Sequence, residues 1–354
     1  MKRILLDYNE DEIAKLLEGQ PRFRTKQVYS WLHKGKDFSE MKNIPTTLRQ
    51  KLSDEYVAKP IVDIVALQSK QDDTVKFLYT FMDGNIIEGV LMHYHYGYTL
   101  CVSTQIGCRM GCTFCASTLG GCVRNLTAGE MMAQVLYANE YIANIINKEG
   151  KVGHIVLMGC GEPLDNYEQT MKFLRMVNHP DGLHISLRNI SVSTCGLANK
   201  IIELANEKLP VTLSVSLHAP NDEIRRTMMP IANRYHMPEL MDAVRYYVKT
   251  TGRRVVFEYA LVEGVNCETG HAKALAKLIS GLQCHVNLIP LNPVKERKLS
   301  SASKKKVETF LSELTRLHVS ATVRREMGTD IAGACGQLRR KVLEKEAEEN
   351  VEFN

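Results

Sequence analysis

The sequence contains no run approaching the roughly 20 consecutive apolar residues that a membrane-spanning helix requires. Its N-terminus lacks the apolar core of a secretion signal, and it has no solenoid-type repeat. Composition also excludes a disordered chain, because 44% of the residues are hydrophobic and 24% are charged. We therefore expect a soluble, cytoplasmic globular protein without a membrane partner.

The excess of basic residues is small. Lys and Arg total 45 against 40 Asp and Glu, which gives a formal net charge of +5. This balance permits a nucleic-acid partner without demonstrating one. A length of 354 residues allows one large domain or a core with a small appendage.

Cysteine is abundant and clustered. Of ten cysteines, seven lie between Cys101 and Cys195. Since the chain has no export signal, metal or redox chemistry is favoured over a disulfide framework. Buried thiols acting as small hydrophobic residues would be the simplest alternative, but they should not cluster in this way.

The chain changes character twice along its length. Residues 1 to about 55 predict short amphipathic helices, and residues 60–92 predict a β-extension with a turn at Asp83-Gly84. From residue 98 strands and helices alternate, which indicates a parallel sheet in an open doubly wound form or in a full or partial barrel. Strands are expected over 100–104, 154–158, 189–193, 212–217, 255–261, 285–289 and 320–323, and helices over 128–146, 167–177, 198–207, 238–250, 270–279 and 303–317.

Cys108, Cys112 and Cys115 form a Cys-x3-Cys-x2-Cys motif directly after the first of these strands. Three closely spaced thiolates suit three irons of a [4Fe–4S] cluster and leave the fourth iron open to a small molecule with an amine and a carboxylate. Two alternatives remain: a zinc ion with a distant fourth ligand, or cysteines without a metal.

The cysteine motif is the mark of the radical S-adenosylmethionine superfamily, and the chain as a whole resembles the dual-specificity RNA adenine-C2 methyltransferases. The resemblance spans most of the chain. It is carried by residues 101–108 (CVSTQIGC), 112–118 (CTFCAST), 124–126 (RNL), 161–164 (GEPL), 216–220 (SLHAP), 287–290 (NLIP), 324–326 (RRE) and 334–338 (ACGQL).

The resemblance implies an α/β fold with a partial (βα)6-type radical SAM barrel, a small N-terminal helical domain and a β-extension. The corresponding boundaries are 1–58 for the helical RNA-binding domain, 59–97 for the β-extension, 98–338 for the barrel with its catalytic loop, and 339–354 for a charged tail. The implied cofactors are one [4Fe–4S] cluster held by Cys108, Cys112 and Cys115, and two molecules of S-adenosylmethionine per turnover.

S-Adenosylmethionine needs separate contacts for its aminoacyl end, ribose and adenine. The resemblance assigns the aminoacyl end to Gly161 and Glu162. It completes the site with Ser193, Ser216, Leu217, His218 and Asn292. Taken singly these residues have simpler readings, such as a strand-end hydroxyl or a hydrogen-bonded core histidine.

Adenine C2 has no lone pair with which to attack a methylsulfonium, so its methylation requires radical chemistry from a cofactor. The resemblance implies that Cys335 is first methylated, that a 5′-deoxyadenosyl radical abstracts hydrogen from this methyl group, and that the carbon adds to C2. Cys101 then resolves the protein–RNA adduct and forms a transient disulfide with Cys335. Glu88 takes the position of the proton acceptor, although a solvent-facing strand glutamate is the alternative reading.

The implied substrates are 23S rRNA and tRNA, and the implied partner is an electron donor such as flavodoxin or ferredoxin, acting on a monomer. Cations at 22–26, 295–298 and 304–306 are candidates for phosphate contacts, although such runs are often solvated faces. No role is assigned to Cys122, Cys160, Cys195, Cys267 or Cys284.

Three other functions stay open. The first is methylation at adenine C8, as in the ribosomal antibiotic-resistance enzymes, although Gly-Glu-Pro at 161–163 and Ala-Ser-Thr at 116–118 favour C2. The second is a radical enzyme that acts on a protein or a metabolite, such as a glycyl-radical activase. The third is an RNA-binding module that holds a cluster or zinc without catalysis.

Overall fold

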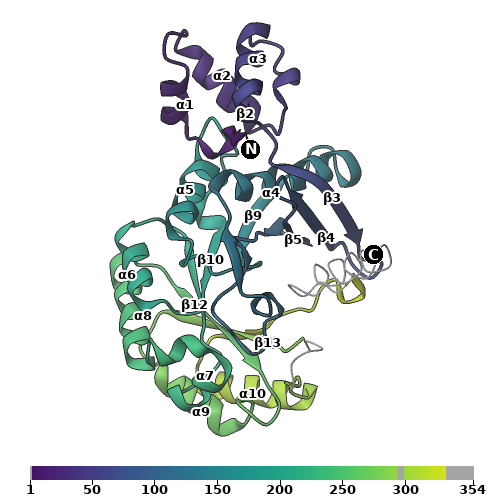
Figure 1. Ribbon diagram of the computed structural model, residues 1–354. Coiled ribbons are helices and arrows are strands. Elements are labelled where there is room, and N and C mark those ends of the chain that lie inside the picture. Colours follow the sequence, from purple (N-terminus) through teal and green to yellow (C-terminus); the bar gives the residue numbers. More distant parts are fainter. Residues whose placement is uncertain (1, 293–298, 332–354) are drawn as a thin grey trace, which may run out of the picture.

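The computed structural model describes residues 2–292 and 299–331. A group of N-terminal helices stands apart from a larger α/β body (Figure 1). These helices are α1 (Glu10–Leu16), α2 (Phe23–Leu32) and α3 (Thr46–Glu55). The short strand β1 (Arg3–Ile4) precedes them, β2 (Tyr56–Val57) follows them, and the two strands pair in parallel. An Asn9 capping box starts α1, and Pro45 precedes α3.

One ten-stranded sheet forms the body. In spatial order its strands are β14 (Ala321–Val323), β13 (Cys284–Pro290), β12 (Val255–Leu261), β11 (Thr212–Ser216), β10 (Ile190–Thr194), β9 (Val152–Leu157), β6 (Gly97–Cys101), β5 (Ile86–Tyr94), β4 (Val75–Phe81) and β3 (Ile61–Gln68). The pairings from β6 to β14 are parallel, and those from β3 to β6 are antiparallel. Within the described ranges β14 and β3 end the sheet, which makes a partial barrel with a β-extension.

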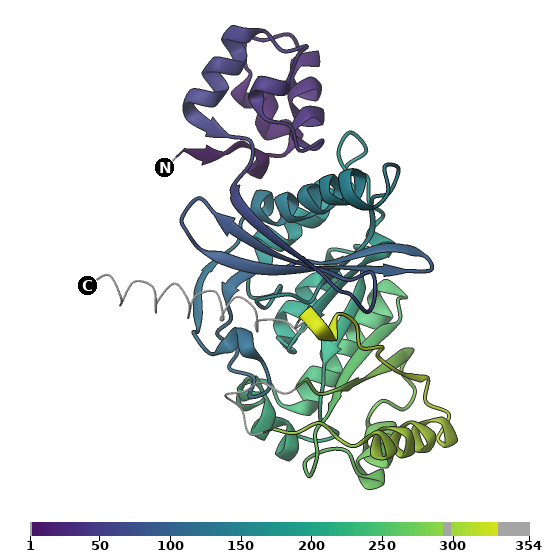
Figure 2. The same ribbon diagram turned by 90° about the vertical axis from the view of Figure 1, so that its right-hand side faces the viewer.

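Helices connect the parallel strands and cover the outside of the sheet (Figures 1 and 2). They are α4 (Ala128–Tyr141), α5 (Tyr167–Asn178), α6 (Ala198–Asn206), α7 (Asp222–Met228), α8 (Met237–Thr251), α9 (Thr269–Leu278) and α10 (Lys304–Arg316). Among the described helices, none combines the length and the apolar character needed to cross a bilayer. The expected α/β partial barrel with an N-terminal helical part is confirmed.

Two expected elements differ from the structure. The strand expected over 100–104 ends at Cys101, because Ser103 leaves the ladder: its hydroxyl donates to the Glu88 carbonyl (2.6 Å) and accepts from Cys160 N–H (2.8 Å). Residues 105–107 instead form β7 (Gln105–Gly107), which pairs with β8 (Cys122–Asn125) in a separate hairpin. The helix expected over 128–146 is α4 followed by a π-helical turn over 142–146.

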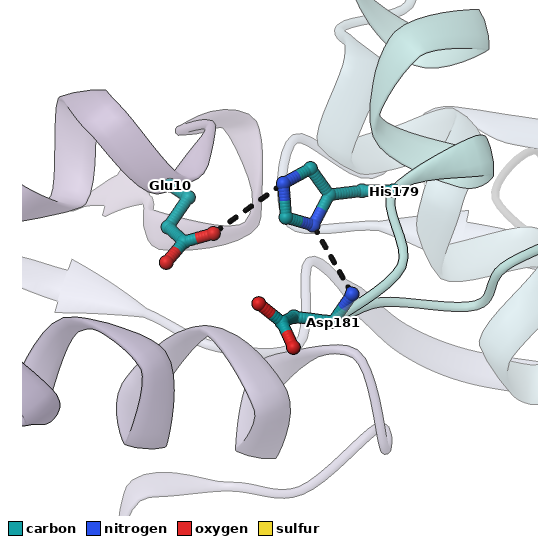
Figure 3. Close-up of side chains that lie close together, drawn as sticks. All are labelled: Glu10, His179 and Asp181. Carbon is teal, nitrogen blue, oxygen red and sulfur yellow. Dashed lines mark hydrogen bonds and ion pairs between the residues drawn. The ribbon is translucent and has the colours of Figure 1, made fainter.

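The N-terminal helices are docked on the body by polar contacts and by a shared apolar core. Figure 3 shows Glu10 of α1 facing His179, which follows α5. The Asp181 N–H donates to His179 Nδ1 (3.3 Å), so the ring proton is on Nε2, 3.3 Å from the Glu10 carboxylate. Lys26 of α2 pairs with Asp181 at 3.2 Å. Polar contacts between α1, α2 and the segment after α5 therefore hold the two parts together.

Candidate active site

A cavity of about 240 Å3 opens where the parallel strands end. The carboxyl ends of strands in such sheets are the usual place for ligands. The cavity is lined by Cys108, Cys112 and Cys115, by Ser193 and Ser216 at the ends of β10 and β11, and by Gly161, Glu162, His218 and Asn292 from the loops that follow strands. Of the residues predicted to bind S-adenosylmethionine, Leu217 alone does not line it.

The three cysteines are held by a loop that closes on itself. Cys108 N–H donates to the Gly121 carbonyl (2.8 Å), and the Cys115 N–H donates to the Cys112 carbonyl (3.2 Å). Gly107 has φ +80°, and a Cβ there would lie 2.0 Å from the Gly121 carbonyl oxygen, so this crossing requires glycine. The loop thus presents three thiols to one cavity.

The thiols resist ionisation in the absence of a cation. Burial and the neighbouring Cys115 and Glu162 raise the pKa of Cys112 to about 12, and burial also raises the pKa of Cys108. Metal ligation requires the thiolate form, so a bound cation has to balance these charges. A site with three neighbouring thiols and room beside them fits a [4Fe–4S] cluster with one iron free of protein ligands.

Gly161 and Glu162 follow β9 and lie against the cysteine loop. A Cβ on Gly161 would come within 2.6 Å of Gln105, and its φ is +109°, so only glycine fits here. Glu162 is 4% exposed and accepts hydrogen bonds from the N–H groups of Cys195 (2.7 Å) and Leu164 (3.1 Å). Burial raises its pKa, and these hydrogen bonds lower it in part.

His218 follows β11 in a strained conformation. Its φ is +57°, which is uncommon for a residue other than glycine and is often found at functional sites. Its Nδ1 accepts from Ala260 N–H (2.9 Å), and burial lowers its pKa to about 3. The neutral ring therefore carries its proton on Nε2. Leu217 is fully buried beside it and contributes backbone groups: its carbonyl accepts from Arg225.

Arg225 of α7 is a fully buried cation behind the cavity wall. Its guanidinium donates to the carbonyls of Cys195 (2.6 Å), Leu217 (3.3 Å) and Ser216 (3.4 Å). Nη1 has no hydrogen-bond partner among the described residues, and no carboxylate of the described chain pairs with the side chain. Because an isolated buried charge is costly, this cation fits a site that receives negative charge from a cluster and a ligand carboxylate.

Glu88 and Cys101 lie outside this cavity, on the neighbouring strands β5 and β6. Cys101 pairs with Val90, so Glu88, two residues before Val90, has its side chain on the same face of the sheet as Cys101. Glu88 is 5% exposed and forms an ion pair with the fully buried Lys76 at 3.0 Å. The alternative reading of Glu88 as a solvent-facing glutamate is therefore wrong.

A second cavity of about 170 Å3 adjoins the first and shares Ile289, Asn292 and Arg324 with it. Its other walls come from β5, through Val90 and Met92, and from residues 325–327. Cys101 packs with Val90 and Met92 in one apolar cluster. Cys335 lies outside the described residues.

Comparisons with known proteins agree with this geometry. Residues 102–273 match the Radical SAM superfamily, and residues 4–57 match the ribosomal RNA large subunit methyltransferase N-terminal domain. The chain is 51% identical over 348 residues to a probable dual-specificity RNA methyltransferase RlmN of Clostridium perfringens (strain 13 / Type A), covering 97% of this chain and 98% of that protein. The chain belongs to the RlmN family.

Two further relatives support membership in the RlmN family. The RlmN protein of Clostridium acetobutylicum is 48% identical over 345 residues, covering 96% of this chain and 98% of that protein. The crystal structure of a radical SAM methyltransferase from Sphaerobacter thermophilus has a TM-score of 0.91 and 42% identity, covering 95% of this chain and 98% of that chain. The protein is thus a radical SAM RNA methyltransferase, and the family implies a [4Fe–4S] cluster and S-adenosylmethionine.

Several cavity residues of this RlmN family member were missed at the level of sequence. Glu258 and Arg324 line the cavity, and Arg225 lies behind its wall and donates to the carbonyl of Cys195, which lines it. Glu258 is 4% exposed, accepts from Asn287 (2.8 Å) and has its pKa raised by burial. The place of Glu258 as a charged residue in the middle of an otherwise apolar expected strand was the available signal, whereas no pattern marks Arg225.

The cysteines without an assigned role have varied surroundings. Cys195 is buried beside Glu162, and burial raises its pKa well above the ordinary value. The Cys160 carbonyl accepts from the N–H groups of Thr104 and Gln105. Cys122 is half-buried on β8, and Cys267 and Cys284 lie away from the cavity.

Proposed function

We propose that this chain transfers a methyl group to C2 of one adenosine of 23S rRNA at the peptidyl transferase centre, and to C2 of the adenosine 3′ to the anticodon of tRNA. The observation that carries the proposal is the single cavity in which the cysteine loop meets the strand-end residues. Relatives named as dual-specificity RNA methyltransferases support the choice of substrate.

The cavity residues have separate tasks in this proposal. Cys108, Cys112 and Cys115 would hold the cluster, which supplies the electron that cleaves S-adenosylmethionine. The carboxylate of Glu162 accepts from the ligand ammonium, and Gly161 lets the backbone beside it pack closely against Gln105. Ser193, Ser216, His218, Asn292 and the backbone at Leu217 hold the remainder of the ligand. The neutral His218 donates from Nε2 without adding positive charge beside a sulfonium.

The second cavity would admit the target adenine. Cys101 and Glu88 share one face of β5 and β6 beside it, and the described chain ends at Ile331, four residues before Cys335. In this proposal the methyl group on Cys335 is the source of the transferred carbon, Cys101 forms the transient disulfide with Cys335, and Glu88 accepts the proton from the adduct.

The partners and organisation follow from the same proposal. The helical part at 1–58 binds RNA, and the extension at 59–97 carries Glu88. The barrel at 98–338 holds the cofactors, and residues 339–354 form a charged tail. A cytoplasmic monomer would receive electrons from a flavodoxin or a ferredoxin and consume two molecules of S-adenosylmethionine per turnover. Lys306 is paired with Glu263 and Glu268, which leaves it less suited to a phosphate; residues 295–298 lie outside the described part.

The decisive experiment reconstitutes the enzyme anaerobically with iron and sulfide. An rRNA fragment and a tRNA that lack the modification are then supplied with S-adenosylmethionine and a reductant. Nucleoside mass spectrometry against 2-methyladenosine and 8-methyladenosine standards identifies the product. We expect 2-methyladenosine with 5′-deoxyadenosine. A Cys335→Ala variant serves as the control and should give no methylated nucleoside.

Other outcomes would reassign the protein. Formation of 8-methyladenosine would place it with the antibiotic-resistance enzymes. Cleavage of S-adenosylmethionine without methylation of either RNA would retain the radical chemistry and reject the substrate. Full turnover by the Cys335→Ala variant would favour a radical enzyme with a different substrate, and no cleavage at all would favour an RNA-binding module.

A further inference from the structure

A third cavity lies at the opposite end of the barrel from the candidate active site. Its volume is about 420 Å3, and it is formed where β10, β11 and β12 begin, by residues 188, 208–212 and 251–254. The active-site cavity is formed where these parallel strands end. Thr212 lines this cavity and Ser216 lines the active-site cavity, and the four residue steps of β11 between them correspond to about 13 Å at 3.3 Å per residue.

The lining of this cavity carries charge of one sign. Arg188, Lys208, Arg253 and Arg254 line it, and no acidic residue does. The side chains of Arg188, Lys208 and Arg254 make no hydrogen bond or ion pair with another described residue. The helices α6 and α8 end beside the cavity, and each C-terminus is equivalent to about half a negative charge. Four cations exceed this amount, so the cavity retains a positive field.

Two of these cations are positioned by local structure. The backbone at Lys208, which follows α6, has φ +52°, in the left-handed region where glycine is the favoured residue. Arg253 donates from Nε to the Val211 carbonyl (2.8 Å) and from Nη2 to the Thr212 hydroxyl (3.2 Å). Its Nη1 is left for a ligand. Cations with free donor groups around a polar cavity are suited to bind phosphate oxygens.

We propose that this cavity binds a backbone phosphate of the RNA substrate, at a point remote from the target adenosine. The inference rests on the proposed function, because it requires an RNA substrate. The ligand chemistry is that of a phosphate oxyanion. An RNA is a more suitable source than an acidic electron donor, since a donor has to approach the cluster and this cavity lies at the far ends of the strands. We expect a short stem-loop that fills the active site to end before this cavity and a full-length RNA to reach it.

The test compares two variants of the reconstituted holoenzyme with the same loss of charge. Arg188→Gln/Arg254→Gln removes two unpaired cations of the cavity. Lys273→Gln/Lys277→Gln removes two exposed cations of α9 and is the control. Affinity for full-length tRNA, a long 23S rRNA transcript and the isolated anticodon stem-loop is measured by fluorescence anisotropy over a series of salt concentrations. Methylation of the stem-loop is measured in parallel.

We expect the cavity variant to bind both long RNAs about tenfold more weakly. The slope of log K against log salt should decrease by about 0.7–0.9 for each phosphate that the variant no longer neutralises. Binding and methylation of the stem-loop, and all properties of the control variant, should be unchanged. A Lys208→Gly variant should show the same selective loss without loss of thermal stability, because glycine relieves the left-handed backbone.

Four results would overturn the proposal: unchanged affinity for the long RNAs, an equal loss in the control variant, an equal loss for the stem-loop, or slower cluster reduction by an acidic donor protein with normal RNA binding. Inorganic phosphate tests whether the cavity is a site for a free anion. In that case added phosphate would raise the melting temperature of the wild type but not of the cavity variant, and both proteins would bind RNA with the same affinity. If the wild type methylates neither the tRNA nor the rRNA, the proposed function fails, and the anisotropy data still decide the RNA contact.

Discussion

Arg225 shows how one residue can connect the cavity wall to the charge of the site. Three carbonyls at the ends of β10 and β11 accept hydrogen bonds from its guanidinium, and it lies close enough to Cys112 for their charges to interact. Burial lowers its pKa, which reflects the missing counter-charge. A buried cation beside a redox centre favours the more negative, reduced state.

We predict that Arg225→Gln makes the midpoint potential of the cluster more negative by about 60 mV or more. This corresponds to about a tenfold loss in the relative stability of the reduced state for a one-electron couple. Arg225→Lys retains the charge and should recover most of the shift. EPR-monitored redox titration of the reconstituted protein measures the potential independently of turnover.

The exposed neighbour Arg226 provides the control for this prediction. It lies on the same helix, and Arg226→Gln removes the same charge without touching the cavity wall. Equal potentials in Arg225→Gln and in the wild type, at equal iron content, would mean that Arg225 has a packing role only. Equal shifts in both variants would indicate a general surface-charge effect.

At the scale of the element, α2 buries an ionisable group without a hydrogen-bond partner. His33 at the end of α2 is 5% exposed, neither ring nitrogen has a partner among the described residues, and burial lowers its pKa to about 3. His179 also lowers this pKa, and the Tyr29 ring packs against His33 at 4.0 Å. The folded state therefore holds His33 in its neutral form.

Acid should destabilise the N-terminal helices. An unfolded histidine has a pKa near 6.5, so between about pH 6.5 and pH 3 the unfolded state binds an additional proton. The folded state then loses about 1.4 kcal/mol per pH unit as the pH falls through this window. Trp31, the single tryptophan of the chain, lies in α2, and its fluorescence reports this unfolding directly.

We predict that His33→Leu shifts the acid midpoint of the Trp31 signal to lower pH, while the exposed His95→Gln control leaves it unchanged. Leucine has no group that must take up a proton, and no hydrogen bond is removed. An unchanged midpoint in His33→Leu would mean that the Glu10–His179 contact (Figure 3), and not His33, causes the acid unfolding of the N-terminal helices.

The elements also show which parts of the fold can be predicted from sequence. Apolar, β-branched runs predicted β9 to β14 to within a few residues, because buried parallel strands are apolar on both faces. The helix α7 was missed because Arg225 and Met228 are its buried residues, which gives no apolar periodicity. The strand expected over 100–104 ended early because side-chain hydrogen bonds of Ser103 replaced the ladder.

The same limit applies to the candidate site. The cysteine spacing is a local pattern, so the sequence alone predicted the cluster ligands. The residues for S-adenosylmethionine were predicted through the family resemblance, and all of them except Leu217 line the same cavity. Lys76 and Arg225 are charged, and charged residues are expected at the surface. Their burial depends on Glu88 and on the Cys195 carbonyl, which belong to other segments of the chain. Contacts of this kind become visible only once the strands are assembled.

At the scale of the whole molecule, the N-terminal part and the barrel share one apolar core. Leu5 and Leu6 are buried in the same cluster as the residues between the sheet and its helices. Gly129 of α4 makes this approach possible: its N–H donates to Asp7 (2.7 Å), and a Cβ there would lie 2.6–2.8 Å from Asp7 and the Leu6 backbone. The docking of the N-terminal part therefore requires a helix surface without a side chain at this position.

We predict that Gly129→Ala loosens this docking and separates RNA methylation from cofactor chemistry. The added methyl group overlaps backbone atoms, which costs about 1–3 kcal/mol in overpacking. The cluster and the Glu162 cavity lie away from this contact, so reductive cleavage of S-adenosylmethionine should continue while KM for RNA rises several-fold. Gly153→Ala on β9 meets no atom within 4 Å and is the matched control. Equal KM values for the wild type and both variants would show that the position of the N-terminal part does not affect substrate binding. Loss of cofactor cleavage in Gly129→Ala alone would show that the shared core supports the active site itself.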